Sequence, residues 1–150
     1  MNTVIVPIGG GGLISGIATA VKNLKPSVKV LGVEPEKASS MYQSLKSGKI
    51  TRLSDTTSIA DGLATREPGS LTYEITKRYV DDIILVSEQE IEKAVFTALN
   101  ECHLAIEPSA AAVIAALEKI HPKPGENVVL VVSGGNVSLK TLASILSKYG

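Results

Sequence analysis

Two hydrophobic periods alternate along this chain, one typical of buried strands and the other of amphipathic helices. The apolar run Val4-Ile5-Val6 predicts a strand, and apolar positions then recur at helical spacing from 13 to about 23. A second strand is predicted over 28–33, ending at Glu34-Pro35. Strand, helix and strand at this spacing indicate the βαβ unit of a parallel sheet.

The rest of the chain continues this alternation after one long, less periodic segment that passes through Thr56. Helices are predicted over 38–47, 71–79 and 88 to about 104, from 108, and over 139–147, with strands over 82–86 and 128–132. Ser87 and Glu90 form a capping box at the start of one helix. The unbroken apolar run of 128–132 predicts a central strand buried on both faces. We therefore predict a single α/β domain over 1–150, in three layers, with a mostly parallel sheet of about four strands flanked by helices.

Composition and charge exclude several classes of partner. Fifteen basic residues balance fifteen acidic ones, which disfavours binding to nucleic acid or to an anionic membrane. With one Phe, four Tyr and no Trp, stacking platforms for bases are not expected either. No apolar run approaches the roughly 20 residues of a membrane span, and the first residues do not resemble a signal peptide. The single cysteine, Cys102, fits a cytoplasmic protein and, from its helical pattern, a place in the core.

Three unusual segments follow predicted strands: 9–12, 34–40 and 133–136. Ligands of parallel α/β sheets bind at the carboxyl ends of the strands. Because those ends lie along one edge of a sheet, we expect the three segments to share one site.

The glycine run, Gly9 to Gly12, favours a phosphate ligand. Glycine lets the backbone approach an anion closely, and the N-terminus of the following helix adds a positive dipole. A tight turn alone would need one or two glycines. The Walker pattern fails because Ile17 and Ala18 follow Gly16, and the dinucleotide spacing fails as well. Glu34 stands where a ribose-binding carboxylate would, which keeps a nucleotide-binding domain as a weaker alternative.

Five motifs occur in order: VPIGGGGL from Val6, GVEP from Gly32, IADG from Ile59, IEPS from Ile106 and VSGGN from Val132. Together they resemble the second half of the pyridoxal-phosphate (PLP) enzymes of the threonine dehydratase and serine racemase family, which have the tryptophan synthase β-subunit fold. The resemblance covers essentially the whole chain. It implies part of the large domain of a lyase that converts L-threonine or L-serine into a 2-oxo acid and ammonia.

The resemblance also implies a role for each matching residue. The cofactor-binding residues would be Gly9, Gly10, Gly11, Gly12, Leu13, Glu107, Ser133 and Asn136. The glycines and the Leu13 N–H would hold the phosphate, and Asn136 would shape the loop that carries Ser133. The Ser133 hydroxyl would lie beside the pyridine nitrogen, making a weaker electron sink than a carboxylate would; the alternative is an ordinary helix N-cap. Glu107 would lie near the ring; its alternative is a favourable charge at a helix N-terminus.

Some members of this family bind a divalent cation through the glutamate of the Glu-Pro motif, an alanine carbonyl and an acid. Glu34 and the carbonyl of Ala38 match, whereas Ser40 occupies the position of the acid. Oxygen ligands suit Mg²⁺ or Ca²⁺, and the loss of a charged ligand weakens such a site.

The family's catalytic lysine, which forms a Schiff base with PLP, lies in an amino-terminal Ser-Phe-Lys-type motif that has no counterpart here. Ser44-Leu45-Lys46 and Ser138-Leu139-Lys140 look similar, but both lie in helical patterns, and we interpret their lysines as solvated. We therefore predict no catalytic residue in this truncated chain and no activity without the lysine-bearing half. The expected partners are that half or an intact homologue, a small amino-acid substrate, and a second copy in a homodimer.

Two other functions stay open at this point. The chain fits a non-catalytic module that binds PLP or another phosphate, or that regulates an intact relative. It equally fits part of an enzyme with serine racemase-type activity. Threonine and serine are not distinguished, because the family's substrate determinants mostly lie in the amino-terminal half.

Overall fold

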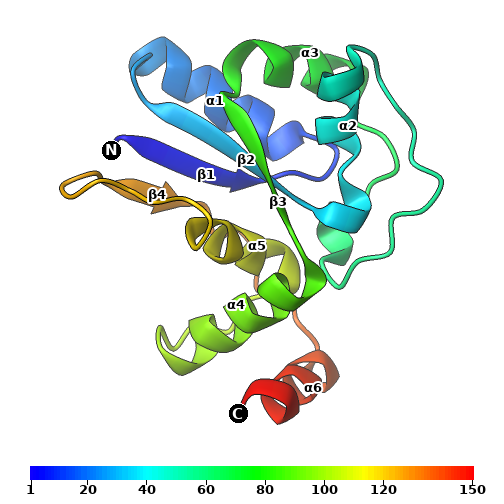
Figure 1. Ribbon diagram of the computed structural model, residues 1–150, viewed down its shortest axis with the longest axis vertical. Helices are drawn as coiled ribbons and strands as arrows, with labels where there is room; N and C mark the ends of the chain where they lie inside the picture. Colours follow the sequence, from blue (N-terminus) through cyan, green and yellow to red (C-terminus); the bar gives the residue numbers. More distant parts are fainter.

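The computed structural model describes residues 1–150 and contains one parallel sheet between two layers of helices (Figure 1). The strands are β1 (Thr3–Pro7), β2 (Lys29–Pro35), β3 (Asp82–Val86) and β4 (Val128–Leu130). Their order in the sheet is β3-β2-β1-β4, and every neighbouring pair is parallel. The predicted three-layer α/β fold with about four parallel strands is confirmed.

Six α-helices and two short 3₁₀ helices accompany the strands, and all of them except the last, α6, lie between strands along the chain. They are α1 (Gly12–Leu24), η1 (Glu36–Ala38), α2 (Ser40–Ser47), η2 (Asp61–Leu63), α3 (Ser70–Tyr79), α4 (Glu88–Asn100), α5 (Pro108–Leu117) and α6 (Leu139–Tyr149). None of them combines the length and the apolar character that crossing a bilayer requires.

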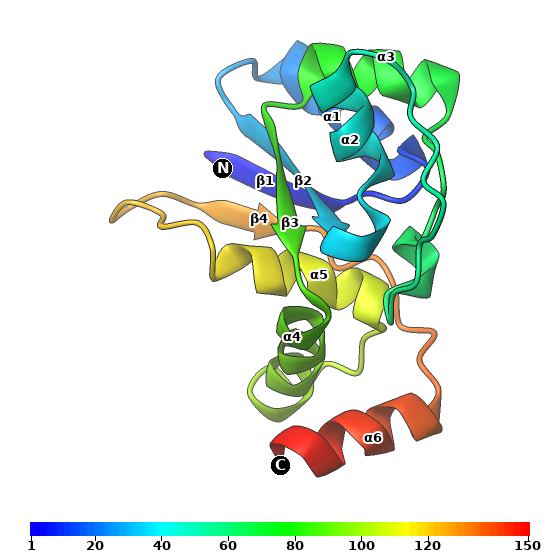
Figure 2. The same cartoon turned by 45° about the vertical axis from the view of Figure 1, so that its right-hand side comes forward.

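Alternate residues of the strands build two cores, one on each face of the sheet. Val4 and Val6 of β1 pack with residues of α1, α2 and α3, whereas Ile5 packs with residues of α4 and α5. Figure 2 shows these helical layers on opposite sides of the strands, with α6 beyond α4. Because all strands run in the same direction, their carboxyl ends lie along one edge of the sheet.

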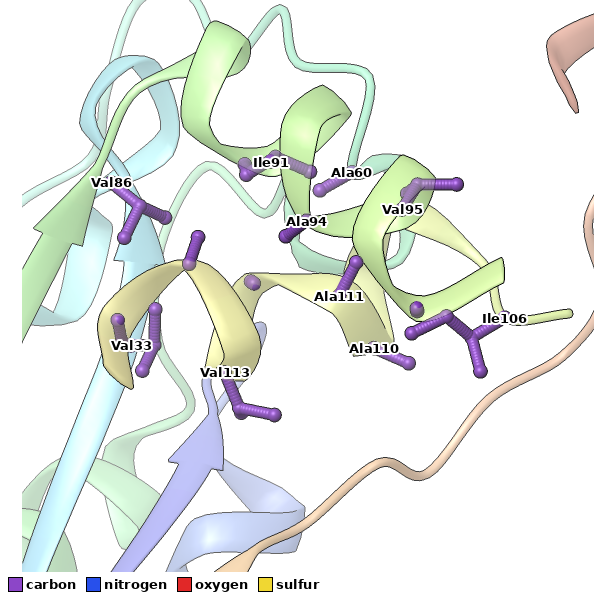
Figure 3. Packing of buried hydrophobic residues seen from close by; sticks show 14 of the residues in the cluster. Val33, Ala60, Val86, Ile91, Ala94, Val95, Ile106, Ala110, Ala111 and Val113 are labelled. Atoms are coloured by element: carbon purple, nitrogen blue, oxygen red, sulfur yellow. The ribbon is translucent and has the colours of Figure 1, made fainter. Parts of the chain in front are cut away.

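Helix α5 is buried on nearly all sides, and eight of its ten residues are buried. Its small side chains let α4 and the sheet approach closely. Figure 3 shows Ala110, Ala111 and Val113 of α5 in the same core as Val95 of α4 and Val33 of β2. This packing fixes the position of the α5 N-terminus.

Helix α4 ends at Asn100, earlier than the predicted end near Leu104. His103 adopts a left-handed conformation with a φ of 57°, and the N–H of Leu104 donates back to the carbonyl oxygen of Ala98 at 2.9 Å. Such a backward bond closes the end of a helix. Cys102 therefore lies exposed in the turn, and its predicted place in the core is wrong.

The strand predicted to be central lies instead at an edge of the sheet. β4 pairs only with β1, is regular only over Val128–Leu130, and leaves Val129 42% exposed. The prediction of burial on both faces is wrong for this chain, because at the edge of the sheet the side chains of β4 have neighbouring side chains on one side only. An apolar edge strand of this kind is suited to pairing with another segment or chain.

Candidate functional site

A cavity of about 260 Å³ lies at the carboxyl edge of the sheet, where the glycine run leaves β1 and the segment 133–136 follows β4. Its lining residues are Pro7, Gly9, Gly10, Gly11, Gly12, Leu13, Gly62, Leu63, Glu107, Ser109, Ala110 and Ser133. Two of the three segments expected to share a site therefore meet here. The third, 34–40, contributes nothing to the lining.

The four glycines have two different environments. A Cβ atom on Gly9 would lie 2.8 Å from a carbonyl oxygen of η2, and one on Gly11 would lie 2.7 Å from a methyl group of α2. Gly11 also has a φ of 91°, in the left-handed region that favours glycine. Cβ atoms on Gly10 and Gly12, by contrast, would meet nothing within 4 Å. Packing therefore requires glycine at positions 9 and 11, whereas positions 10 and 12 border open space.

The backbone N–H groups of residues 9–13 donate no hydrogen bond to other backbone groups. They precede or open α1, whose N-terminus carries the positive end of the helix dipole. The first turn of α1 contains no acidic residue that would neutralise this dipole. Unpaired N–H groups beside an open cavity are suited to a phosphate group.

Glu107 connects the start of α5 to the loop after β4. Its N–H donates to the carbonyl oxygen of Gly134 at 3.2 Å, and its Oε2 accepts a hydrogen bond from the N–H of Asn136 at 2.9 Å. A Cβ atom on Gly134 would collide with the Glu107 side chain. Glu107 lines the cavity and also immediately precedes α5. A place near the cofactor ring and a favourable charge at the helix N-terminus are therefore compatible roles for this residue. Asn136 itself does not line the cavity.

Ser133 lines the cavity and does not cap a helix. The N-cap of α6 is Ser138, whose hydroxyl accepts a hydrogen bond from the N–H of Thr141 at 3.0 Å. The N-cap alternative for Ser133 is therefore wrong. Ser133 is exposed, so its hydroxyl is accessible to a ligand in the cavity.

Ser109 is a site residue that sequence reasoning did not select. It is 5% exposed, and its hydroxyl accepts a hydrogen bond from the N–H of Gly62 at 3.1 Å, which fixes η2 against α5. Gly62 and Leu63 thereby form part of the cavity wall. The Asp-Gly and Glu-Pro-Ser motifs were visible separately, but only the tertiary fold brings together residues 47 positions apart.

Glu34 lies outside the cavity, fully buried at the end of β2. Its two carboxylate oxygens accept hydrogen bonds from the N–H groups of Met41 (2.9 Å) and Tyr42 (2.8 Å) in the first turn of α2. Burial raises the pKa of Glu34 to about 7, although these two bonds act to lower it. Glu34 therefore fixes α2 to the sheet as a buried capping group.

This geometry does not fit the Mg²⁺ or Ca²⁺ expected at Glu34 and the carbonyl of Ala38. Both Glu34 oxygens face backbone N–H groups, and Ser40, at the position of the acid, lies with its hydroxyl 3.4 Å from that of Thr65. No cluster of three or more His, Cys, Asp or Glu side chains is present. Such cations need about six oxygen ligands. The buried carboxylate is also inaccessible to a ribose.

No lysine lines the cavity. Lys46 of α2 and Lys140 of α6 are both exposed and lie elsewhere, which agrees with their interpretation as solvated charges. The cavity thus combines free N–H groups, a hydroxyl and a carboxylate, but it contains no side-chain amine.

The sequence of this chain matches a known protein family. Residues 1–134 match the family described as pyridoxal-phosphate dependent enzyme. The chain belongs to this family. The match includes the glycine loop, Glu107 and Ser133, and it confirms the resemblance drawn from the five motifs.

Known enzymes resemble the chain along nearly its whole length. It is 41% identical to an L-threonine ammonia-lyase of Thermotoga maritima, over 99% of this chain and 37% of that protein. It is 43% identical to a catabolic L-threonine dehydratase of Staphylococcus aureus, over 97% and 43% of the two chains. The structure of maize serine racemase superposes with a TM-score of 0.88 at 40% identity, over 98% and 46%. The chain thus spans less than half the length of these relatives.

Proposed function

We propose that this chain is the part of an L-threonine or L-serine ammonia-lyase that binds the phosphate and the ring of PLP. The observation that carries the proposal is the cavity in which the glycine loop, Glu107 and Ser133 meet while no lysine is present. The similarity to an L-threonine ammonia-lyase and an L-threonine dehydratase supports the reaction and the substrate class.

The glycine loop is suited to the phosphate of PLP. The unpaired N–H groups of 9–13 would donate to the phosphate oxygens, and the α1 dipole would favour their charge. Gly10 and Gly12 would let the phosphate approach the backbone, because a side chain at either position would extend into open space.

Ser133 is suited to the pyridine nitrogen of the cofactor. When bound, PLP supplies an electron sink for the negative charge that develops at the substrate Cα. A neutral hydroxyl beside the nitrogen does not hold it protonated as a carboxylate would, which favours prompt loss of the β-hydroxyl. Glu107 would keep the loop of Ser133 in place through its bond to the Asn136 N–H.

The residues of this chain that line the cavity supply binding groups but no lysine. The cavity of about 260 Å³ is smaller than the roughly 300–1,000 Å³ of complete small-molecule sites, as expected for one wall of a larger site. A lysine-bearing segment would close the site and remove the Cα proton. The exposed apolar edge of β4 offers such a segment a place to pair.

The test is to purify the chain, measure PLP binding by equilibrium dialysis, and assay L-threonine with and without the amino-terminal half of the Thermotoga maritima enzyme. We expect saturable PLP binding by the chain alone, no 2-oxo acid from the chain alone, and 2-oxo acid from the mixture. Turnover by the isolated chain would overturn the assignment of roles. Saturable binding with no turnover in the mixture would favour a non-catalytic or regulatory module.

Racemisation of serine is a second candidate activity. It is favoured by the 40% identity to maize serine racemase over 98% of this chain. The complemented assay distinguishes the two reactions, because elimination from L-serine gives a 2-oxo acid and ammonia while racemisation gives D-serine. Chiral chromatography of the products decides between them.

A further inference from the structure

Thr72, in the first turn of α3, contacts the glycine loop but does not line the cavity. Its hydroxyl donates a hydrogen bond of 2.6 Å to the carbonyl oxygen of Gly10, and the N–H of Gly69 donates to the same oxygen at 3.3 Å. The Thr72 hydroxyl also lies 3.0 Å from the Gly69 carbonyl oxygen. Because a hydroxyl has one proton, the shorter contact to Gly10 is the stronger bond.

This bond determines where the next N–H group points. The carbonyl of Gly10 and the N–H of Gly11 belong to one planar trans peptide, so they point in opposite directions. With the carbonyl held toward α3, the N–H of Gly11 points away from α3. Gly11 lines the cavity, and its N–H donates no bond to other backbone groups.

Two further contacts hold this arrangement. The carbonyl oxygen of Thr72 accepts a hydrogen bond from the hydroxyl of Ser15 in α1, at 3.3 Å. A Cβ atom on Gly11 would lie 2.9 Å from Thr72 Cβ and 2.7 Å from Met41 Cε, so the loop rests directly on these side chains. Helices α1 and α3 lie side by side in both views (Figures 1 and 2), and Thr72 joins them at the glycine loop.

We propose that Thr72 is a positioning residue that orients the N–H of Gly11 toward the phosphate in the cavity. The proposal rests on the proposed PLP site, since it assigns the cause of that site's geometry. Thr72 does not line the cavity and need not touch the ligand. It acts by fixing one peptide plane before binding, which spares the ligand the cost of ordering it.

The test compares three variants of the full chain. Thr72→Val removes the hydroxyl at nearly constant volume, and Thr72→Ser keeps it. Thr76→Val is the matched control: Thr76 lies one turn further along α3, fully buried, and its hydroxyl has no partner. Thermal unfolding of each variant shows whether it folds like the parent chain.

Two readouts are needed, one of them independent of PLP. In the ligand-free, isotope-labelled chain, Thr72→Val should move the Gly10 carbonyl carbon and Gly11 amide resonances, while Thr72→Ser and Thr76→Val leave them nearly in place. In titrations with PLP and with inorganic phosphate, Thr72→Val should weaken binding about tenfold, the effect of one lost hydrogen bond of ordinary strength. Thr72→Ser should restore most of the affinity.

The outcomes separate this proposal from the proposed function. If Thr72→Val leaves the Gly10 and Gly11 resonances unchanged, or moves them without weakening measurable binding, the positioning role is overturned. If the parent chain binds neither PLP nor phosphate while the resonances still move in Thr72→Val alone, PLP binding by the isolated chain fails. The control of the loop by Thr72 is then supported.

Discussion

The carboxylate of Glu107 accepts a hydrogen bond from the backbone N–H of Asn136 at 2.9 Å, which joins the N-terminus of α5 to the loop that carries Ser133. A buried helix thus sets the position of an exposed loop. The bond is charge-assisted, and such bonds are stronger than those between neutral groups.

Glu107→Ala should therefore destabilise the chain and loosen the Ser133 loop. We expect a loss of about 0.5–1.5 kcal/mol in the free energy of unfolding, because the bond to the Asn136 N–H is lost but the exposed N–H can then bond to water. Glu107→Gln retains an acceptor oxygen and should cost about 0.5 kcal/mol or less. Urea unfolding measures both changes. Equal losses for the two variants would show that the hydrogen bond is not what Glu107 contributes.

Gly134→Ala should reproduce much of the effect of Glu107→Ala. The new Cβ atom would collide with the Glu107 side chain, which must swing away and release Asn136. Gly135→Ala is the matched control, because its nearest neighbour would lie at an acceptable 3.4 Å. In the Glu107→Ala background, Gly134→Ala should cost little, because the collision no longer exists. Additive losses in the double variant would contradict this coupling.

Gly12→Ala should weaken PLP binding without unfolding the chain. A Cβ atom at Gly12 meets nothing within 4 Å, and its φ is outside the left-handed region, so the fold accepts alanine. The methyl group would instead occupy space beside the phosphate site, and we expect at least about a tenfold loss of affinity, about 1.4 kcal/mol. Gly16→Ala, one turn further along α1 and also unobstructed, should leave binding unchanged. Equal affinities for the two variants would contradict the assignment of the loop.

Local patterns predicted the strands and most helices because the information for them lies in neighbouring residues. The capping box is an example: the Ser87 hydroxyl accepts from the Glu90 N–H at 3.3 Å, and the Glu90 carboxylate accepts from the Ser87 N–H at 2.6 Å. The place of β4 in the sheet depends on which strands pair with it, and an apolar run predicts only that its residues avoid water. The wrong prediction for 128–132 has this cause.

The site was predicted in part for the same reason. The glycine loop and Ser133 are visible as motifs at strand ends, so their convergence follows from the parallel sheet. Ser109 and Thr72 have ordinary sequence surroundings, and only the tertiary fold places their hydroxyls on Gly62 and Gly10. Glu34 has a strand-end position like the others, but its side chain turns into the core toward α2.

The buried Glu34 should give the chain an unusual pH dependence. Its pKa is raised from an ordinary 4.5 to about 7 by burial, so between these values the folded chain retains a proton that the unfolded chain has lost. The stabilisation that Glu34 contributes is therefore fully present below pH 4.5 and is lost as the pH rises through about 7. The loss should amount to about 3 kcal/mol at most.

Glu34→Gln isolates this effect, because the glutamine side chain does not titrate and all other titratable groups are retained. Replacing one oxygen by an amide removes an acceptor for Met41 or Tyr42, which lowers stability by an amount independent of pH. The free energy of unfolding of the parent chain minus that of Glu34→Gln should thus fall between pH 5 and pH 8. Urea unfolding across this range measures the difference. Parallel curves for the two proteins would mean that Glu34 is ionised in the folded chain throughout, and that the N-terminus of α2 compensates its burial.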